Sequence, residues 1–89
     1  MEEKILHLTL KKKWFDEILK GNKKVEYREK KPYWRKRLFD KNNEPIAYDS
    51  VFFRNGYSKD CMKMKVEFKG LRISKDYEIL LGDVVWKEG

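Results

Sequence analysis

The chain has one cysteine, Cys61, and one histidine, His7, among its 89 residues. A single cysteine excludes an internal disulfide and is typical of a reducing compartment. One thiol and one imidazole also predict that there is no structural zinc site, because such sites need about four soft ligands. We therefore expect a cytoplasmic protein that holds neither a metal nor another cofactor.

Several other features are missing from the sequence. No run of about 18 apolar residues occurs, so no transmembrane helix and no membrane partner are expected. The first ten residues contain two early acids and an apolar stretch too short for a signal peptide. The glycine-rich patterns G-x-x-x-x-G-K-[S/T] and G-x-G-x-x-G are absent, which argues against nucleoside triphosphate and dinucleotide sites. Serine, threonine and cysteine are few, and none lies in a recognisable nucleophile motif.

Charge is abundant and unevenly placed. Charged residues form 42% of the chain and the net charge is +7, whereas an average globular protein has about 25% charged residues. Residues 1–41 contain 14 Lys or Arg and 7 Asp or Glu, and residues 42–89 contain 8 of each, so the first half carries the whole excess. Aromatic residues interleave the basic stretch, and rings beside cations suit base stacking with phosphate pairing. A solvated lysine-rich face and a nucleic-acid partner both stay open as interpretations.

The hydrophobic pattern predicts mostly short strands. Alternation of apolar and polar side chains indicates strands over residues 4–10, 24–30, 51–54, 62–69 and 77–86. The alternation slips at Gly70, which indicates a β-bulge. Gly82 and Asp83 interrupt the last strand, and we expect a turn or kink there.

Two helices are expected in the basic half. Residues 12–20 have apolar side chains at helical spacing, and one stripe collects Trp14, Phe15, Ile18 and Leu19. Gly21 follows as a C-terminal stop, and Pro32 begins a second short helix that runs to about residue 39. The length favours a single domain over residues 1–89. We expect an α+β fold, a small curved sheet or partly open β-barrel with two helices.

The segment from Gly21 to Arg28 is the strongest candidate site. It reads as a helix stop, a turn and a strand, so that Glu26 and Arg28 project from one strand face with Lys23 at the mouth of the turn. A guanidinium, a carboxylate and an ammonium in one patch can hold a polar ligand such as a phosphate or a base edge. The spacing alone also permits an exposed Glu–Arg ion pair of little energetic value.

These residues give the chain its resemblance to the ASCH family, a branch of the PUA-like superfamily. The matching parts are the opening strand over residues 5–10, the segment 14–21, and the signature G-x-K-x-x-E-x-R at Gly21, Lys23, Glu26 and Arg28. The similarity continues through residues 31–34, 37–38, 54–57 and 79–82, and within the family the chain more closely resembles small stand-alone bacterial and phage ASCH proteins. It implies a PUA-like small β-barrel with an N-terminal helix, a cleft at the signature, and RNA or a nucleoside or nucleobase as the ligand.

The first functional hypothesis is a module that binds RNA or a modified nucleoside around Lys23, Glu26 and Arg28. Phosphates would be attracted by Lys11, Lys12, Lys13, Arg35 and Lys36. Tyr33 and Trp34 beside Arg37 are candidates for stacking a base, although Trp34 equally fits as a cap on the barrel. Asn55 and Tyr57 are candidates for lining the cleft, although a plain hairpin turn explains them as well.

The alternative is a small hydrolase that acts on N4-acetylcytidine-type nucleosides or cleaves RNA. Some ASCH members remove that acetyl group with a proposed Lys–Thr–Glu set; the resemblance maps the Lys to Lys23, the Thr to Glu26 and the distal Glu to Glu67. A carboxylate nucleophile would form an anhydride, so Glu26 would instead activate a water as general base. Whether the protein is an enzyme is left open, and no residue selects a third possibility, a phage-type interaction protein that uses the basic face against a host protein.

Overall fold

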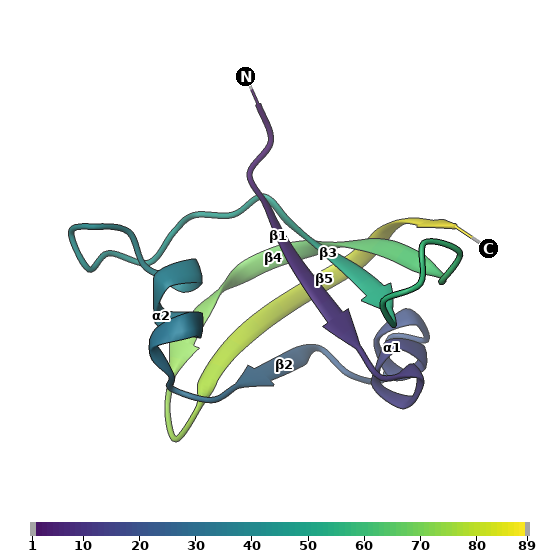
Figure 1. Cartoon of the computed structure of the whole chain (residues 1–89), viewed down its shortest axis with the longest axis horizontal. Helices are drawn as coiled ribbons and strands as arrows, with labels where there is room; N and C mark the ends of the chain where they lie inside the picture. Colours follow the sequence, from purple (N-terminus) through teal and green to yellow (C-terminus); the bar gives the residue numbers. More distant parts are fainter. Residues whose placement is uncertain (1, 89) are drawn as a thin grey trace.

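The fold is built from five strands and two helices, and the computed structural model describes residues 2–88 of it (Figure 1). The elements follow in the order β1 (Ile5–Leu10), α1 (Lys12–Leu19), β2 (Val25–Arg28), α2 (Pro32–Leu38), β3 (Ser50–Asn55), β4 (Lys63–Ile73) and β5 (Tyr77–Glu88). The predicted α+β class with two short helices in the basic half is confirmed.

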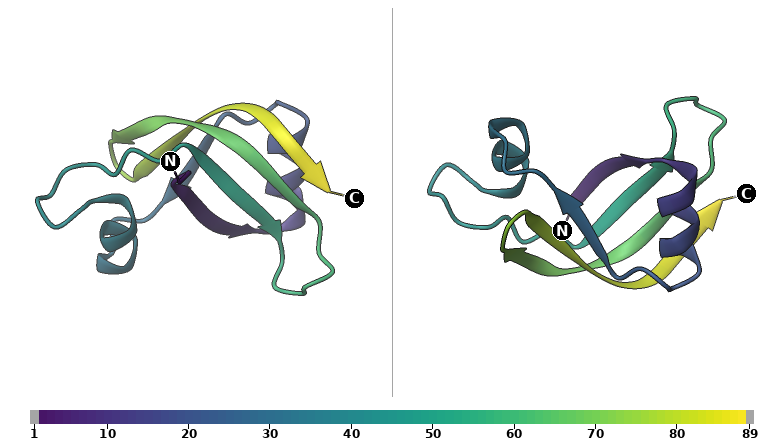
Figure 2. Two further views of the ribbon diagram at one scale, coloured as in Figure 1. Left: turned by 90° about the horizontal axis from the view of Figure 1, so that it is seen from above. Right: turned by 90° about the horizontal axis from the view of Figure 1, so that it is seen from below.

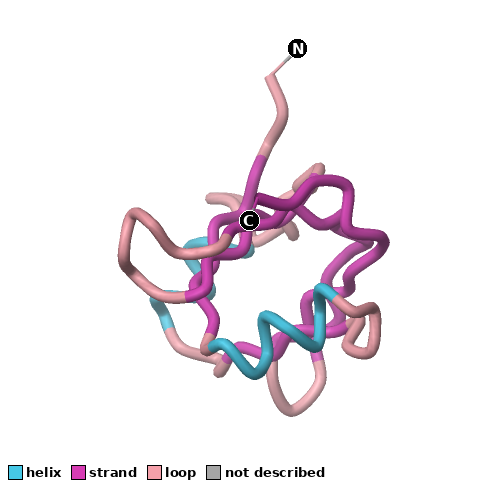
Figure 3. The backbone as a smooth tube through the Cα atoms, turned by 90° about the vertical axis from the view of Figure 1, so that its right-hand side faces the viewer, coloured by secondary structure: helices cyan, strands magenta, loops and turns pink. Residues whose placement is uncertain are grey.

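All five strands belong to one sheet, in the order β1-β3-β4-β5-β2. β1 pairs with β3 in parallel, and the other pairs are antiparallel. The sheet curls strongly, with α1 and α2 at opposite ends (Figure 2). Seen from one end, the strands and a helix together outline a ring (Figure 3). The first and last strands in the order, β1 and β2, are therefore the two edges of a half-barrel.

The core fills the inside of this curl. Strand alternation places every second side chain inward, and the predicted face of Leu6, Leu8 and Leu10 is buried. Phe53 and Ile79, from β3 and β5, are fully buried on the same side. Other buried side chains come from the two helices and from β3, β4 and β5: Phe15, Ile18, Leu38, Val51, Met64, Val66 and Leu81.

The last strand is kinked but not interrupted where a turn or kink was expected. β5 runs without a turn from Tyr77 to Glu88, and its pairing register shifts at Gly82 and Asp83. The extra residues are absorbed as a bulge, since the pairing with β4 shifts between Val66 and Phe68. Another of the register shifts, between Phe68 and Gly70, confirms the bulge predicted at Gly70. Bulges let two long strands keep pairing while they bend, which gives the sheet its curl.

Candidate functional site

The end of α1 sets the position of Lys23. Gly21 adopts a φ of +83°, and its N–H donates to the Ile18 carbonyl at 3.0 Å while the Asn22 N–H donates to the Glu17 carbonyl at 3.0 Å. This is a Schellman motif, which satisfies carbonyls that the helix end leaves free. The Lys23 N–H donates to the same Glu17 carbonyl at 3.2 Å. The helix end predicted at Gly21 therefore also fixes the position of Lys23, just before the start of β2.

Glu26 points into the half-barrel. Its neighbour across the sheet is Ile79, which is fully buried, and only 4% of the Glu26 surface is exposed. Its Oε1 lies 3.6 Å from Lys23 Nζ, and its Oε2 accepts a hydrogen bond from Arg28 Nη1 at 2.5 Å. The Lys23 and Arg28 side chains are themselves 18% and 17% exposed. The three charged side chains of the signature thus converge, and we call them the charge cluster (Lys23, Glu26, Arg28).

Arg28 joins the two edges of the sheet. Its Nη2 donates to the Thr9 carbonyl of β1 at 3.4 Å, and its Nη1 also donates to the Tyr27 carbonyl of β2 at 3.0 Å. Its Nε is buried and has no hydrogen-bond partner among residues 2–88. The charge cluster therefore lies at the seam where the curled sheet brings β1 and β2 together, with one donor unused.

Aromatic rings flank the charge cluster on both sides. Lys23 Nζ lies 5.0 Å from the ring centroid of Trp14 and 4.9 Å from that of Tyr27. On the other side, Arg28 Cζ lies 5.0 Å from the ring centroid of Trp34. These distances are within the range of cation–π attraction. Each cation is therefore held by the buried carboxylate and by at least one ring.

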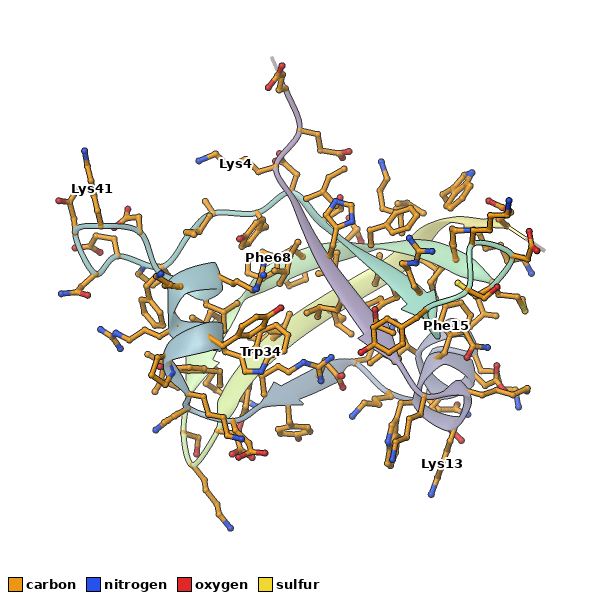
Figure 4. The ribbon with its side chains drawn as sticks, in the orientation of Figure 1. Lys4, Lys13, Phe15, Trp34, Lys41 and Phe68 are labelled. Carbon is orange, nitrogen blue, oxygen red and sulfur yellow. The ribbon has the colours of Figure 1, made fainter. Side chains whose placement is uncertain are left out.

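The contacts continue from Trp34 along α2. Tyr33 and Trp34 meet edge to face with centroids 4.8 Å apart, and Arg37 Cζ lies 4.3 Å from the Tyr33 centroid. Figure 4 shows Trp34 between α2 and the strands. Charged and aromatic side chains thus form one unbroken series, which we call the cation–aromatic row: Trp14, Tyr27, Lys23, Glu26, Arg28, Trp34, Tyr33 and Arg37.

An open cleft lies at one end of this row, between α1 and β2. Its volume is about 440 Å³, and its lining comprises Lys13, Trp14, Glu17, Asn22, Lys23, Lys24, Val25 and Tyr27. The Trp14 and Tyr27 side chains that face it are 41% and 49% exposed. Of the charge cluster only Lys23 lines this α1–β2 cleft, so Glu26 and Arg28 stand behind it and orient it.

Trp14 and Tyr27 were predicted as rings within the basic stretch that suit base stacking, but not as residues of the candidate site. Trp14 was expected in the apolar stripe of α1, but Phe15 and Ile18 fill the core and Trp14 is left largely outside. Tyr27 alternates with Glu26 and Arg28, so it must face outward once they face inward. A tryptophan beside lysines and a tyrosine inside the signature were the available signals.

Glu67 is not brought to the charge cluster. It lies between Val66 and Phe68, which face the core, so it projects from the outer face while Glu26 faces the interior. Its Oε1 accepts a hydrogen bond from the Asp83 N–H at 2.9 Å, and its Oε2 lies 3.7 Å from Lys69 Nζ. That backbone hydrogen bond, with the Lys69 charge, lowers the pKa of Glu67 below its ordinary value.

The remaining candidates are spread over the surface. Asn55 ends β3 and its N–H donates to the Met62 carbonyl at 2.9 Å, while Tyr57 in the following loop is 90% exposed. Within residues 2–88, the lining of the α1–β2 cleft includes neither Asn55 nor Tyr57.

The three lysines at the start of α1 differ in their surroundings. Lys13 lines the cleft, and its Nζ lies 4.8 Å from the Trp14 centroid. Lys12 Nζ is paired with Asp16 at 2.6 Å, and Lys11 is exposed just before the helix. Of the three predicted phosphate contacts, Lys13 is therefore the one at the site.

Within residues 2–88, no three His, Cys, Asp or Glu side chains are grouped so that they could hold a metal ion. Over the same residues, no helix is long and apolar enough to cross a membrane. Comparisons with protein-family models, with curated proteins and with solved structures give no match. What this site can do therefore has to be argued from its own geometry.

Proposed function

We propose that the protein binds single-stranded RNA, or a nucleoside from it, at the α1–β2 cleft. The observation that carries the proposal is Lys23, whose ammonium stands between the rings of Trp14 and Tyr27 and is anchored from behind by buried Glu26. Exposed rings beside anchored cations are what unpaired bases and their phosphates require. The resemblance to the ASCH family supports the same ligand and favours RNA.

Each part of the cleft has a chemical role in this proposal. The exposed faces of Trp14 and Tyr27 stack bases, and each such stack contributes about 1–3 kcal/mol. Lys13 and Lys23 pair with phosphates, and their contribution falls as salt rises. Glu26 and Arg28 do not touch the phosphates; they keep Lys23 extended and close the seam behind it.

The test is a titration of labelled single-stranded RNA followed by fluorescence anisotropy at several salt concentrations. We expect log K to fall with log salt at a slope of about 0.7 for each phosphate contact. Trp14→Ala should weaken binding about 5- to 150-fold, the loss of one stack. Trp86→Ala is the matched control, because Trp86 is equally exposed but stacks on Phe52 with centroids 5.9 Å apart, away from the cleft. No binding at low salt, or equal losses in the two variants, would refute the proposal.

The hydrolase alternative keeps part of its residue set. Lys23 and Glu26 form an ion pair at 3.6 Å, which is longer than the roughly 2.6–3.2 Å of a proton-transferring hydrogen bond, and Glu67 lies on the other face of the sheet. Acetate release from N4-acetylcytidine, measured with the parent chain and with Lys23→Ala, separates the two functions. A binding module releases no acetate; turnover that disappears in Lys23→Ala would make the protein an enzyme.

A further inference from the structure

We infer that the ligand is an RNA chain of several nucleotides rather than a free nucleoside, because α2 and the loop after it form a second groove for the phosphates of the same strand. This inference rests on the proposed function. The groove has a volume of about 730 Å³ and its lining includes Tyr33, Arg35, Lys36, Phe39 and Lys41. We call it the α2 groove.

The loop that forms one wall of the α2 groove is tied to the helix. Asp40 Oδ1 accepts hydrogen bonds from the N–H groups of Asn42 and Glu44, at 2.8 and 3.0 Å. The Ile46 N–H then donates to the Leu38 carbonyl at 2.9 Å. The wall is therefore preformed, and binding does not have to order it.

The cations of this groove are available to a ligand. Lys36 and Lys41 are exposed and make no ion pair among residues 2–88. Arg35 lies over the Phe39 ring with its Cζ 4.8 Å from the centroid, and its Nη2 donates to Asn43 Oδ1 at 3.2 Å. Among residues 2–88, the Arg35 guanidinium makes no ion pair and no other side-chain hydrogen bond. Three cations beside the rings of Tyr33 and Phe39 fit a phosphate backbone better than a neutral ligand.

The cation–aromatic row connects the two binding regions. Tyr33 lines the α2 groove and contacts Trp34, and Trp34 covers Arg28 of the charge cluster. In Figure 4, Lys41 and Lys13 mark opposite ends of the molecule and Trp34 lies between them. A strand whose base stacks on Trp14 can follow this row to the α2 groove. It needs at least about four nucleotides, the lower end of the range that a small single-strand-binding domain covers.

The experiment compares a dinucleotide with an octanucleotide of the same base. The test variant is Arg35→Gln/Lys36→Gln/Lys41→Gln. The matched control removes the same charge elsewhere, at three exposed lysines that make no ion pair among residues 2–88: Lys59→Gln/Lys75→Gln/Lys87→Gln. We expect the groove variant to bind the octanucleotide at least tenfold more weakly than the control, with a salt slope about two units smaller. Its affinity for the dinucleotide should equal that of the control.

The outcomes separate this inference from the function on which it rests. If the groove variant and the control bind the octanucleotide equally, or if the octanucleotide binds no better than the dinucleotide, the α2 groove is not used. Trp14→Ala then decides the proposed function separately, because it should weaken the binding of both ligands. If Trp14→Ala weakens neither, the α1–β2 cleft is not the binding site.

Discussion

At the scale of single residues, the decisive feature is the buried carboxylate of Glu26. A buried ion costs several kcal/mol of desolvation unless partners surround it. Here Lys23 and Arg28 approach its two oxygens from opposite sides, and both cations also contact rings. Lys23 and Arg28 would otherwise repel each other, and Glu26 therefore holds both cations at the seam.

Removing that charge should cost stability. Glu26→Gln keeps the size of the side chain but leaves Lys23 and Arg28 without their common anion. We expect the free energy of unfolding in urea to fall by about 3 kcal/mol, the lower end for breaking a buried ion pair, because both cations keep some exposure. Glu29→Gln is the control: Glu29 pairs with Lys31 at the surface, and its loss should cost under about 1 kcal/mol. Equal losses would mean that the burial of Glu26 is energetically unimportant.

The sequence predicted the grouping of these residues but not their burial. A period of two places Glu26 and Arg28 on one face, and that part is confirmed. The alternation does not show which face of β2 points into the core. Hydrophobicity would favour the face of Val25 and Tyr27, because these two are more apolar than Glu26 and Arg28. Only the curl of the sheet, which brings Thr9 of the far edge within reach of Arg28, turns the polar face inward.

At the scale of elements, the junction between α1 and β2 aligns the site. Gly21 holds a left-handed conformation, and a Cβ there would meet nothing within 4 Å. Gly21→Ala should therefore act through backbone strain alone and lower the free energy of unfolding by about 1 kcal/mol. For a chain of this size that corresponds to about 4–8 °C in Tm, measured by circular dichroism. Gly21→Asn should lose less, because asparagine visits this conformation more readily; an equal or larger loss would contradict the explanation.

At the bulge between β4 and β5, the carboxyl group of Glu67 makes the free energy of unfolding depend on pH. The Asp83 N–H, together with the Lys69 charge, lowers the pKa of Glu67 in the folded state below its value of 4.5 in an unstructured chain. Protonation of Glu67 then favours the unfolded state, so its stabilising contribution is present above about pH 4.5 and is lost as the pH falls through the lowered pKa.

Urea unfolding at pH 7 and pH 3 tests this assignment. The parent chain should be more stable than Glu67→Gln at pH 7. The difference should shrink at pH 3, because Glu67 of the unfolded chain takes up its proton at a higher pH than Glu67 of the folded chain. A difference of the same size at both pH values would contradict the assignment.

Elements whose signals are local were predicted well, and those that depend on distant contacts were not. The slip in alternation at Gly70 and the helix stop at Gly21 can be read within a few residues. The continuity of β5 past Gly82 involves Glu67, which is sixteen residues away in the sequence and whose carboxylate accepts a hydrogen bond from the Asp83 N–H. A Cβ on Gly82 would lie 2.6 Å from Glu67 Oε1, so this glycine is needed for packing and not for a turn.

At the scale of the whole molecule, the curled sheet gives the protein two different faces. The seam between its edges carries the charge cluster, and the helices at its two ends add the α1–β2 cleft and the α2 groove (Figure 1). The outer face carries Phe52 and Trp86 instead, with Lys65 between them already paired with Glu3 at 2.8 Å. Along the seam, available cations and exposed rings lie together beside both the α1–β2 cleft and the α2 groove, and this arrangement supports the proposed path of the RNA.

The three tryptophans report on this path directly. Trp14 lies at the α1–β2 cleft, Trp34 lies over Arg28, and Trp86 lies on the outer face. Each indole N–H gives its own signal in a nitrogen-15 correlation NMR spectrum, so one titration with a single-stranded octanucleotide follows all three. We predict that the Trp14 and Trp34 indole signals shift while that of Trp86 stays in place. Movement of the Trp86 signal alone, or of none of the three at saturating RNA, would contradict the account.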